Sequence, residues 1–287
     1  MRVRILDEAG SCVAEQSGSG EFELRVPGAK PWETDSPVRY TCEAELLNRH
    51  GAVIDRVQEK FGFRTAVFKA DGFYLNGKKS FLRGLNRHQS YPYIGYAAPE
   101  HLQREDARIL KEELQCTAVR TSHYPQSQYF IDECDRLGLL VFTEIPGWQH
   151  IGDESWKLQA IQNVKEMVLQ YRNHPSIVLW GVRINESLDD DEFYVRTNAA
   201  AHALDPSRQT SGVRYLQKSS LLEDVYAFND FSHTGDNPGV LPKSKVSTHP
   251  EKALLVSEHN GHMFPTKSFD PRSEEHTSEL QSLAYLV

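Results

Sequence analysis

The feature that most constrains the fold is the alternation of short apolar runs with helical segments that begins after residue 80. Helical periodicity fills the intervals between the first four runs, over 99–114, 126–137 and 157–172, and returns over 192–204. Strands that alternate with helices pair in parallel, so the pattern predicts an α/β fold. We count seven strands, over 81–85, 118–121, 139–145, 177–184, 209–214, 224–228 and 253–257.

Two architectures accommodate this alternation, an open doubly wound sheet and a closed (β/α)8 TIM barrel. A doubly wound nucleotide-binding sheet carries a glycine-rich phosphate loop after its first strand, and none follows 81–85. Polar and aromatic clusters instead follow several strands, where a barrel carries its active site. We therefore expect an incomplete (β/α)8 TIM barrel of about seven strands over 67–271.

The stretch 1–66 has a different character, with short alternating runs such as 22–26 and 39–46 separated by Gly, Pro and Ser. This pattern predicts antiparallel strands. An immunoglobulin-like sandwich needs about seven strands in ~100 residues, and this stretch offers four or five. We expect a partial immunoglobulin-like β-sandwich over 1–66, and a β-hairpin over 72–79 at the start of the barrel domain.

The last stretch, 272–287, breaks the character of the chain before it and resembles translated adapter sequence. We expect an artefactual or disordered tail there, and a barrel that lacks its last strand.

Composition excludes several functional classes. The net charge of −8 comes from scattered acidic residues, and no Lys or Arg block could follow a nucleic-acid backbone. The cysteines show no metal or disulfide spacing, and no apolar run approaches the ~20 residues of a membrane span. Met1–Arg4 opens a strand pattern rather than a signal peptide. Cytoplasmic and periplasmic or secreted locations both stay open, as does the oligomeric state.

Two glutamates stand at the ends of predicted barrel strands. Glu186 follows the run that ends at Ile184, and Glu258 directly follows the run 253–257. For Glu186 alone, a helix-capping role carries about equal weight. Glycoside cleavage uses two such carboxyl groups, one to protonate the leaving oxygen and one to attack the anomeric carbon. Because 258 − 186 = 72 residues separate them, only the fold can bring them together.

Several ordered segments between residues 31 and 271 resemble glycoside hydrolase family 2. They are Phe61-Gly62-Phe63-Arg64, Leu75-Asn76-Gly77-Lys78, Arg83-Gly84-Leu85-Asn86-Arg87-His88, Arg120-Thr121-Ser122-His123-Tyr124-Pro125, Arg172-Asn173-His174-Pro175-Ser176 and Asn185-Glu186-Ser187. The resemblance implies a retaining β-glycosidase with Glu186 as general acid/base and Glu258 as nucleophile. The mechanism requires surroundings that keep Glu186 protonated and Glu258 ionised.

The resemblance also implies substrate-binding residues. His88 and His123 resemble the sugar-contacting histidines of the family, although a buried structural role remains an alternative for both. Asn185 is placed to hold the sugar 2-hydroxyl. Tyr226 is expected to hydrogen-bond the nucleophile, with core packing a close alternative.

Aromatic and arginine side chains complete the predicted surroundings. Trp148 is expected to form a flat wall against a sugar ring, and Trp180 to do so or to pack in the core. We expect Arg64 and Arg120 to brace the barrel through buried pairing rather than touch substrate.

The β-galactosidases of the family often bind magnesium near the catalytic acid through a glutamate and a histidine after the third strand. Here Glu144 alone is well placed. We therefore expect no organic cofactor and disfavour a metal, with magnesium kept as the alternative.

Together these features predict hydrolysis of terminal β-linked sugars from an oligosaccharide or glycoside, with galactose as the expected sugar. Activity on β-glucuronides or β-mannosides is the alternative within the family. An inactive carbohydrate-binding fragment is the alternative of another class, because an unclosed barrel leaves sheet edges open.

Overall fold

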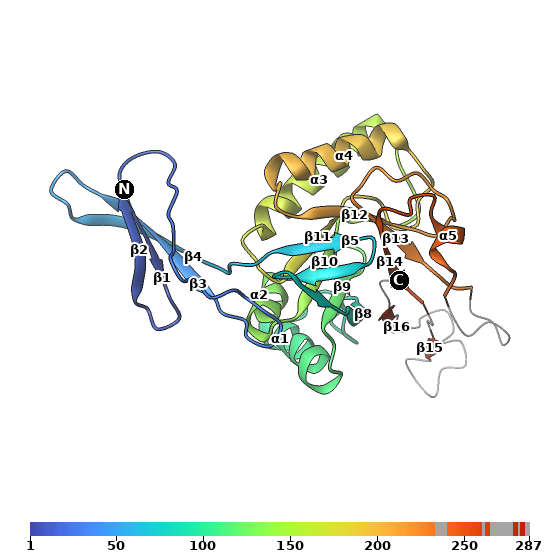
Figure 1. Cartoon of the computed structure of the whole chain (residues 1–287), viewed down its shortest axis with the longest axis horizontal. Helices are drawn as coiled ribbons and strands as arrows, with labels where there is room; N and C mark the ends of the chain where they lie inside the picture. The colour runs from blue at the N-terminus through green and yellow to red at the C-terminus, as the bar shows by residue number, and fades with distance from the viewer. Residues whose placement is uncertain (233–239, 260–261, 265–277, 281, 285–287) are drawn as a thin grey trace.

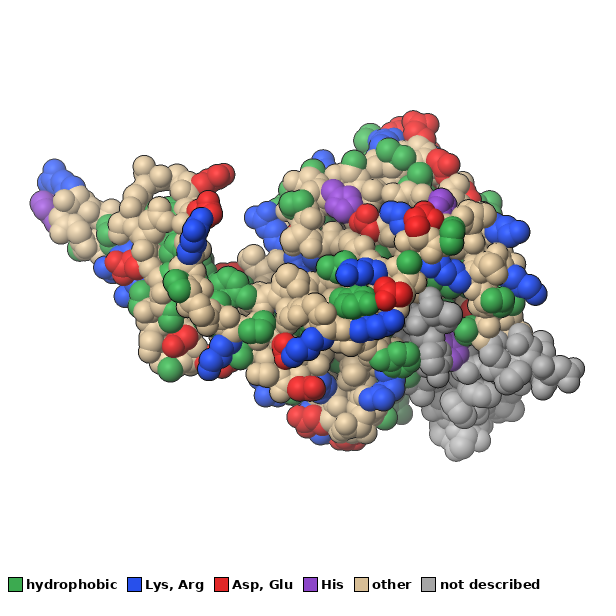
Figure 2. Space-filling view, viewed as in Figure 1, with side chains coloured by type: hydrophobic (Ala, Val, Ile, Leu, Met, Phe, Trp, Pro, Cys, Tyr) green, Lys and Arg blue, Asp and Glu red, His purple; other side chains and the backbone are tan. Residues whose placement is uncertain are grey.

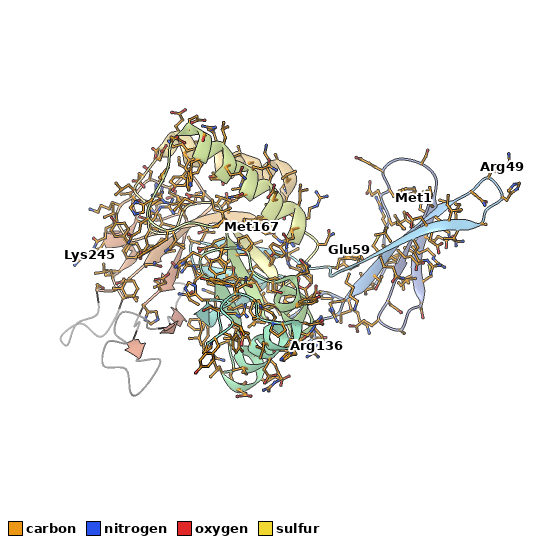
Figure 3. The ribbon with its side chains drawn as sticks, turned by 180° about the vertical axis from the view of Figure 1, so that it is seen from behind. Met1, Arg49, Glu59, Arg136, Met167 and Lys245 are labelled. Carbon is orange, nitrogen blue, oxygen red and sulfur yellow. The ribbon has the colours of Figure 1, made fainter. Side chains whose placement is uncertain are left out.

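The computed structural model describes residues 1–232, 240–259, 262–264, 278–280 and 282–284. A small antiparallel sheet lies at one end of the molecule, and a larger α/β unit lies at the other (Figure 1). Seen from behind, Met1 and Arg49 lie on the small sheet, Glu59 lies near the junction, and Lys245 lies at the far end of the α/β unit (Figure 3).

The N-terminal sheet has the strand order β2-β1-β3-β4 and is antiparallel throughout. Its strands are β1 (Arg2–Leu6), β2 (Cys12–Ser17), β3 (Tyr40–Leu47) and β4 (Val53–Phe61). The sheet supplies one layer of the predicted sandwich. The strand predicted over 22–26 does not form. These residues lie in the long connection between β2 and β3 and pair with no strand among the described residues.

A three-stranded antiparallel sheet follows, made of β5 (Ala66–Lys69), β6 (Gly72–Leu75) and β7 (Lys78–Ser80). The hairpin predicted over 72–79 is therefore confirmed. Phe68 and Phe73 of this sheet pack with Ala118 and Leu140, which are the first residues of two barrel strands. This three-stranded sheet thus covers the amino-terminal end of the barrel, opposite the end where a barrel carries its active site.

Seven parallel strands form the barrel, as the sequence predicted. They are β8 (Arg83–Arg87), β9 (Ala118–Thr121), β10 (Leu140–Glu144), β11 (Ile177–Gly181), β12 (Gln209–Arg214), β13 (Val225–Asn229) and β14 (Ala253–Glu258).

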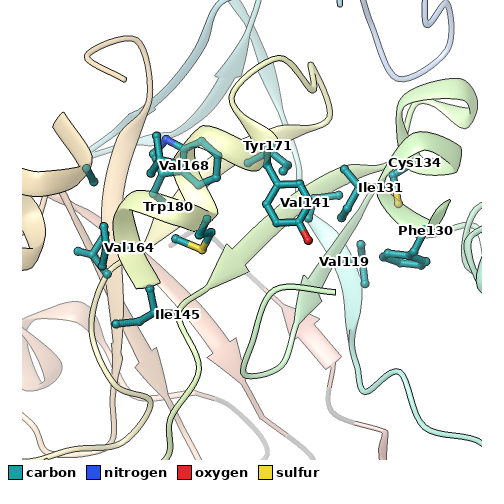
Figure 4. Packing of buried hydrophobic residues seen from close by; sticks show 14 of the residues in the cluster. Val119, Phe130, Ile131, Cys134, Val141, Ile145, Val164, Val168, Tyr171 and Trp180 are labelled. Atoms are coloured by element: carbon teal, nitrogen blue, oxygen red, sulfur yellow. The ribbon is translucent and has the colours of Figure 1, made fainter. Parts of the chain in front are cut away.

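Helices connect the strands and cover the outside of the barrel (Figure 1). They are α1 (Glu100–Arg108), continued by a π-helical turn over Ile109–Glu113, α2 (Gln128–Leu137), α3 (Glu154–Tyr171), α4 (Asp191–Leu204) and the short α5 (Lys243–Val246). Residues such as Val119 and Val141 on the strands pack against Phe130, Ile131 and Val168 on the helices (Figure 4). This layer of apolar contacts holds the helices against the strands.

Short strands also form near the end of the chain among the residues that the structure describes. β15 (His262–Phe264) pairs antiparallel with β16 (Ser278–Leu280), and β17 (Ser282–Ala284) pairs antiparallel with β8. β17 also approaches β14, so it occupies the gap between the first and last parallel strands. The free edge of an open sheet pairs with any extended segment within reach, which accounts for strands where we expected none. The rest of 272–287 lies outside the described residues.

The surface carries acidic and basic side chains interspersed over both parts of the molecule (Figure 2). Among the described residues, no helix is both long and apolar enough to cross a membrane.

Candidate active site

Glu186 lies on a tight turn that follows β11. The strand ends at Gly181, whereas the sequence predicted it to continue to residue 184. A tight turn follows over residues 184–187, in which Ser187 N donates to Ile184 O at 3.2 Å and Glu186 N donates to Val213 O at 3.0 Å. Glu186 has a φ of +53°, a left-handed value that costs a non-glycine residue about 1–3 kcal/mol. This turn holds a partly exposed carboxyl group at the carboxyl end of the barrel.

Glu258 reaches the same end of the barrel through a β-bulge. Along β14, Ala253 and Leu255 face the barrel interior, so simple alternation would turn Glu258 outward. The register against β13 shifts at this point, since Phe228 lies opposite Val256 but Asn229 lies opposite Glu258. The extra residue re-aims the side chain that follows it. Glu258 is consequently 3% exposed and points among the other polar groups of the barrel.

Arg120 from β9 is the partner of Glu258. Its guanidinium donates to Glu258 Oε1 and also, at 2.9 and 2.8 Å, to the two carboxylate oxygens of Glu144. Burial raises the pKa of Glu258, and the charges of Arg120 and His123 oppose that rise. The raised pKa differs from our expectation of an environment that favours the ionised form. Arg120 is the main group that counters this effect of burial.

Asn185 and the two predicted histidines lie beside this ion pair. Arg120 Nη2 donates to Asn185 Oδ1 at 2.8 Å and lies 2.9 Å from His123 Nδ1. The His123 and His88 rings meet edge to face with centroids 5.4 Å apart. Burial, together with the charges of His123 and Arg120, lowers the pKa of His88 to about 4. His88 is therefore neutral near pH 7 and can present one donor and one acceptor.

Trp148 lies against Glu186. Its indole Nε1 donates to Glu186 Oε2 at 3.0 Å, and its backbone forms an isolated parallel bridge with Asn185. The side chain is nevertheless 59% exposed. An indole that is anchored at its nitrogen and open on its face suits the apolar side of a sugar ring, which is the role predicted for it. Trp180, in contrast, is fully buried and donates to Asp205 Oδ2, so it belongs to the core.

Tyr226 does not bond the nucleophile, which corrects our prediction. Its hydroxyl accepts from Ser219 N at 3.1 Å and donates to Leu216 O at 3.4 Å. The reason is strand alternation, because Val225 and Ala227 face the barrel interior and the residue between them must face outward. Tyr226 packs on that outer side with Phe228.

Two residues at the site were assigned differently or overlooked in the sequence. Arg120 was placed outside the site as a brace, and it does pair in a buried setting, but its partners are Glu258 and Glu144. Asn229 was not singled out, yet its Nδ2 donates to Glu186 Oε1 at 2.9 Å. Alternation along the strand that contains Ala227 would have indicated Asn229. Arg64 is a brace as expected, because it donates to the backbone oxygens of Pro175 and Ile177.

The contacts of Glu144 do not fit the magnesium site that the family resemblance suggested. Both of its carboxylate oxygens accept from Arg120, so a cation would compete with the guanidinium for the same oxygens. Burial acts to raise the pKa of Glu144, but Arg120 and His123 hold it below its usual range. Within the described residues, no three His, Cys, Asp or Glu side chains are grouped to hold a metal ion.

Comparisons with known proteins agree with this arrangement. Residues 66–269 match the model described as glycosyl hydrolases family 2, TIM barrel domain, and residues 3–64 match the model described as glycosyl hydrolases family 2. A β-galactosidase of Thermoanaerobacterium thermosulfurigenes is 55% identical over 263 residues, which is 90% of this chain and 36% of that protein.

Solved structures show the same likeness. β-Glucuronidase 3 of Bacteroides uniformis is 34% identical with a TM-score of 0.71, over 80% of this chain and 31% of that one. An FMN-binding β-glucuronidase from Facaelibacterium prausnitzii L2-6 is 28% identical with a TM-score of 0.81, over 94% of this chain and 45% of that one. The chain spans about a third of the length of the curated relatives it matches. The matched family models cover nearly all of it, and the chain belongs to family 2 of the glycosyl hydrolases.

Proposed function

We propose that this chain carries the catalytic machinery of a retaining β-glycosidase. The observation that supports this most directly is the meeting of two carboxyl groups at one end of the barrel. Glu258 ends β14 and Glu186 follows β11, and Asn229 of β13 joins them, since it donates to Glu186 Oε1 at 2.9 Å and lies opposite Glu258.

The two glutamates divide the chemistry between them. Glu186 protonates the oxygen of the leaving group while Glu258 attacks the anomeric carbon, and a covalent glycosyl-enzyme forms. Water then attacks that carbon, Glu186 takes a proton from the water, and the sugar leaves with its original configuration. Arg120 holds the nucleophile, and Asn185, whose side-chain oxygen accepts from Arg120, is the residue proposed to hold the 2-hydroxyl of the sugar.

We propose a terminal β-galactoside as the substrate. The support is the β-galactosidase of T. thermosulfurigenes, at 55% identity over 90% of this chain. A β-glucuronide is the second candidate, because the similar solved structures are β-glucuronidases.

The test uses the purified 287-residue chain and a panel of nitrophenyl β-galactoside, β-glucuronide and β-mannoside, with Glu258→Gln as the control. We expect release from the galactoside and a loss of several orders of magnitude in the control. Proton NMR of the first product should show the β-anomer before mutarotation. Preference for the glucuronide would retain the mechanism and replace the sugar. Unchanged turnover in Glu258→Gln would contradict the mechanism, and sugar binding without turnover would favour a carbohydrate-binding fragment.

We also propose that turnover requires no divalent cation, because Arg120 occupies both oxygens of Glu144. Dialysis against EDTA should leave kcat unchanged, and magnesium added at millimolar concentration should not raise it. A large, magnesium-reversible loss would contradict this and would mean that Arg120 gives way to a cation.

A further inference from the structure

Asn229 links the two catalytic strands. It is the last residue of β13, is 3% exposed, and lies opposite Glu258 across the β-bulge. Its amide nitrogen donates to Glu186 Oε1 at 2.9 Å, and its amide oxygen accepts from Ser257 Oγ at 2.9 Å. A chain of hydrogen bonds therefore runs from the residue before the nucleophile to the acid/base.

The orientation of the Asn229 amide follows from these two partners. If the amide were reversed, its oxygen would face a carboxylate oxygen of Glu186, and two acceptors would meet without a proton between them. Ser257 is fully buried, and its hydroxyl supplies the proton that the amide oxygen accepts. The N–H of Asn229 is thus directed at Glu186 before any substrate binds.

We infer that Asn229 is a positioning residue that holds Glu186 and stabilises its carboxylate as the proton passes to the leaving group. The inference rests on the proposed function. In the first step negative charge appears on Glu186, and a donor already in place stabilises it without reorganisation. In the second step the same carboxylate must accept a proton from water, and the same hydrogen bond keeps it aimed at the reaction centre.

Other groups around Glu186 also affect its protonation. Trp148, after β10, donates to the second oxygen of Glu186, and the charge of Glu186 acts to raise the pKa of Glu258 on β14. Arg120 donates to Glu258, Glu144 and Asn185 and lies 2.9 Å from His123 Nδ1, so its guanidinium is occupied by groups other than Glu186. Within the described part of the chain, Asn229 and Trp148 are the two side chains that donate to the Glu186 carboxylate.

The kinetic test compares Asn229→Ala with the native chain on two galactosides that share the sugar and differ in the leaving group. Loss of a hydrogen bond to a charged group predicts a fall of about 10- to 100-fold in kcat for a methyl galactoside, whose leaving group needs the proton. The dinitrophenyl galactoside should lose much less in kcat/KM, which reports the first step alone, because its leaving group departs without the proton. The alkaline limb of the pH–rate profile should move to higher pH, because the ionised form loses a donor.

A second readout does not depend on turnover. Since the indole of Trp148 bonds directly to Glu186, the fluorescence difference between the native chain and Trp148→Phe should titrate with Glu186. Removing Asn229 should move that midpoint upward by about 1–2 pH units, the equivalent of the 10- to 100-fold change. Asn229→Asp preserves the shape of the side chain and places a second carboxylate there, so it should move the midpoint further in the same direction.

Asn198→Ala is the matched control. Asn198 lies on α4, where its amide oxygen accepts from Thr210, outside the catalytic end of the barrel. This variant should leave both the leaving-group ratio and the fluorescence midpoint unchanged.

The inference is overturned if Asn229→Ala folds and slows both galactosides equally while the pH–rate limb and the fluorescence midpoint stay in place. That result would mean a structural role only. If the native chain hydrolyses none of the glycosides, the proposed function fails instead, and the fluorescence titration still decides whether Asn229 acts on Glu186.

Discussion

Arg120 is the residue on which the electrostatics of the site depend. It is fully buried, and its guanidinium contacts Glu144, Glu258 and Asn185. A buried arginine is tolerated only when carboxylates and carbonyl oxygens satisfy it, and the reverse holds for the carboxylates. Stability and catalysis therefore share one set of contacts at this position.

Replacing Arg120 by Met should destabilise the protein by about 3–5 kcal/mol, because two buried carboxylates lose their counter-charge. Urea unfolding followed by circular dichroism measures the loss. Arg108→Met is the control, since Arg108 pairs with Glu105, Glu112 and Glu113 on the surface, where water screens ion pairs. Equal losses in the two variants would contradict the role given to burial.

His88 predicts a pH dependence of stability. Its pKa is about 4 in the folded protein against an ordinary value of 6.5, so the unfolded chain binds a proton between these pH values and the folded chain does not. The free energy of unfolding should therefore fall as the pH drops from about 6.5 to about 4. His88→Gln removes this contribution, and urea titrations at pH 7, 5.5 and 4.5 should show a shallower fall. An equally steep fall in the variant would show that His88 is not held neutral.

At the scale of elements, strand alternation decides which side chains enter the site. Tyr226 and Asn229 belong to the same strand but face opposite sides of it, so one packs outside the barrel and the other bonds Glu186. The bulge opposite Asn229 overrides the same alternation in β14 and turns Glu258 inward. Because the strands are closely packed, neither the alternation of side chains along β13 nor the bulge in β14 can shift easily.

Gly212 on β12 tests that packing. A methyl group there would lie 2.2 Å from Arg183 Cβ and 2.6 Å from Glu223 Oε1, so Gly212→Ala should destabilise by about 1–3 kcal/mol. Thermal unfolding should show a lower Tm. Gly18→Ala is the control, because its nearest neighbour beyond the adjacent residues is the Phe22 ring at 3.7 Å. A Tm for Gly212→Ala as high as that of the control would mean that β12 can move away.

At the scale of the whole molecule, Trp32 joins the N-terminal segment to the barrel. It is fully buried, its indole donates to Asp135 O at 2.8 Å, and its own carbonyl accepts from Asn76 Nδ2 at 3.0 Å. It also packs in the same apolar cluster as Phe68 and Phe73 of the three-stranded sheet that covers the amino-terminal end of the barrel. The connection before β3 is therefore part of the barrel core rather than a free linker.

Trp32→Ala should cost about 3–5 kcal/mol, because it opens a large cavity and leaves the backbone oxygen of Asp135 without its donor. Unfolding in urea, followed by intrinsic fluorescence and by circular dichroism, should give coincident transitions in the native chain and separate ones in the variant. Trp148→Ala, at an exposed tryptophan, should change stability little. Coincident transitions in Trp32→Ala would show that other contacts couple the two parts.

The sequence by itself determined the α/β alternation, the seven parallel strands and the two glutamates at strand ends, because these depend on local periodicity and on where apolar runs stop. Tertiary structure decided the early end of β11, the left-handed turn at Glu186, the bulge before Glu258 and the partners of Arg120. Each of these depends on contacts between residues that lie far apart in the chain, such as Arg120 and Glu258 or Asn229 and Glu186. Such contacts leave no periodic signal in the sequence, and they exist only once the barrel has brought the strand ends together.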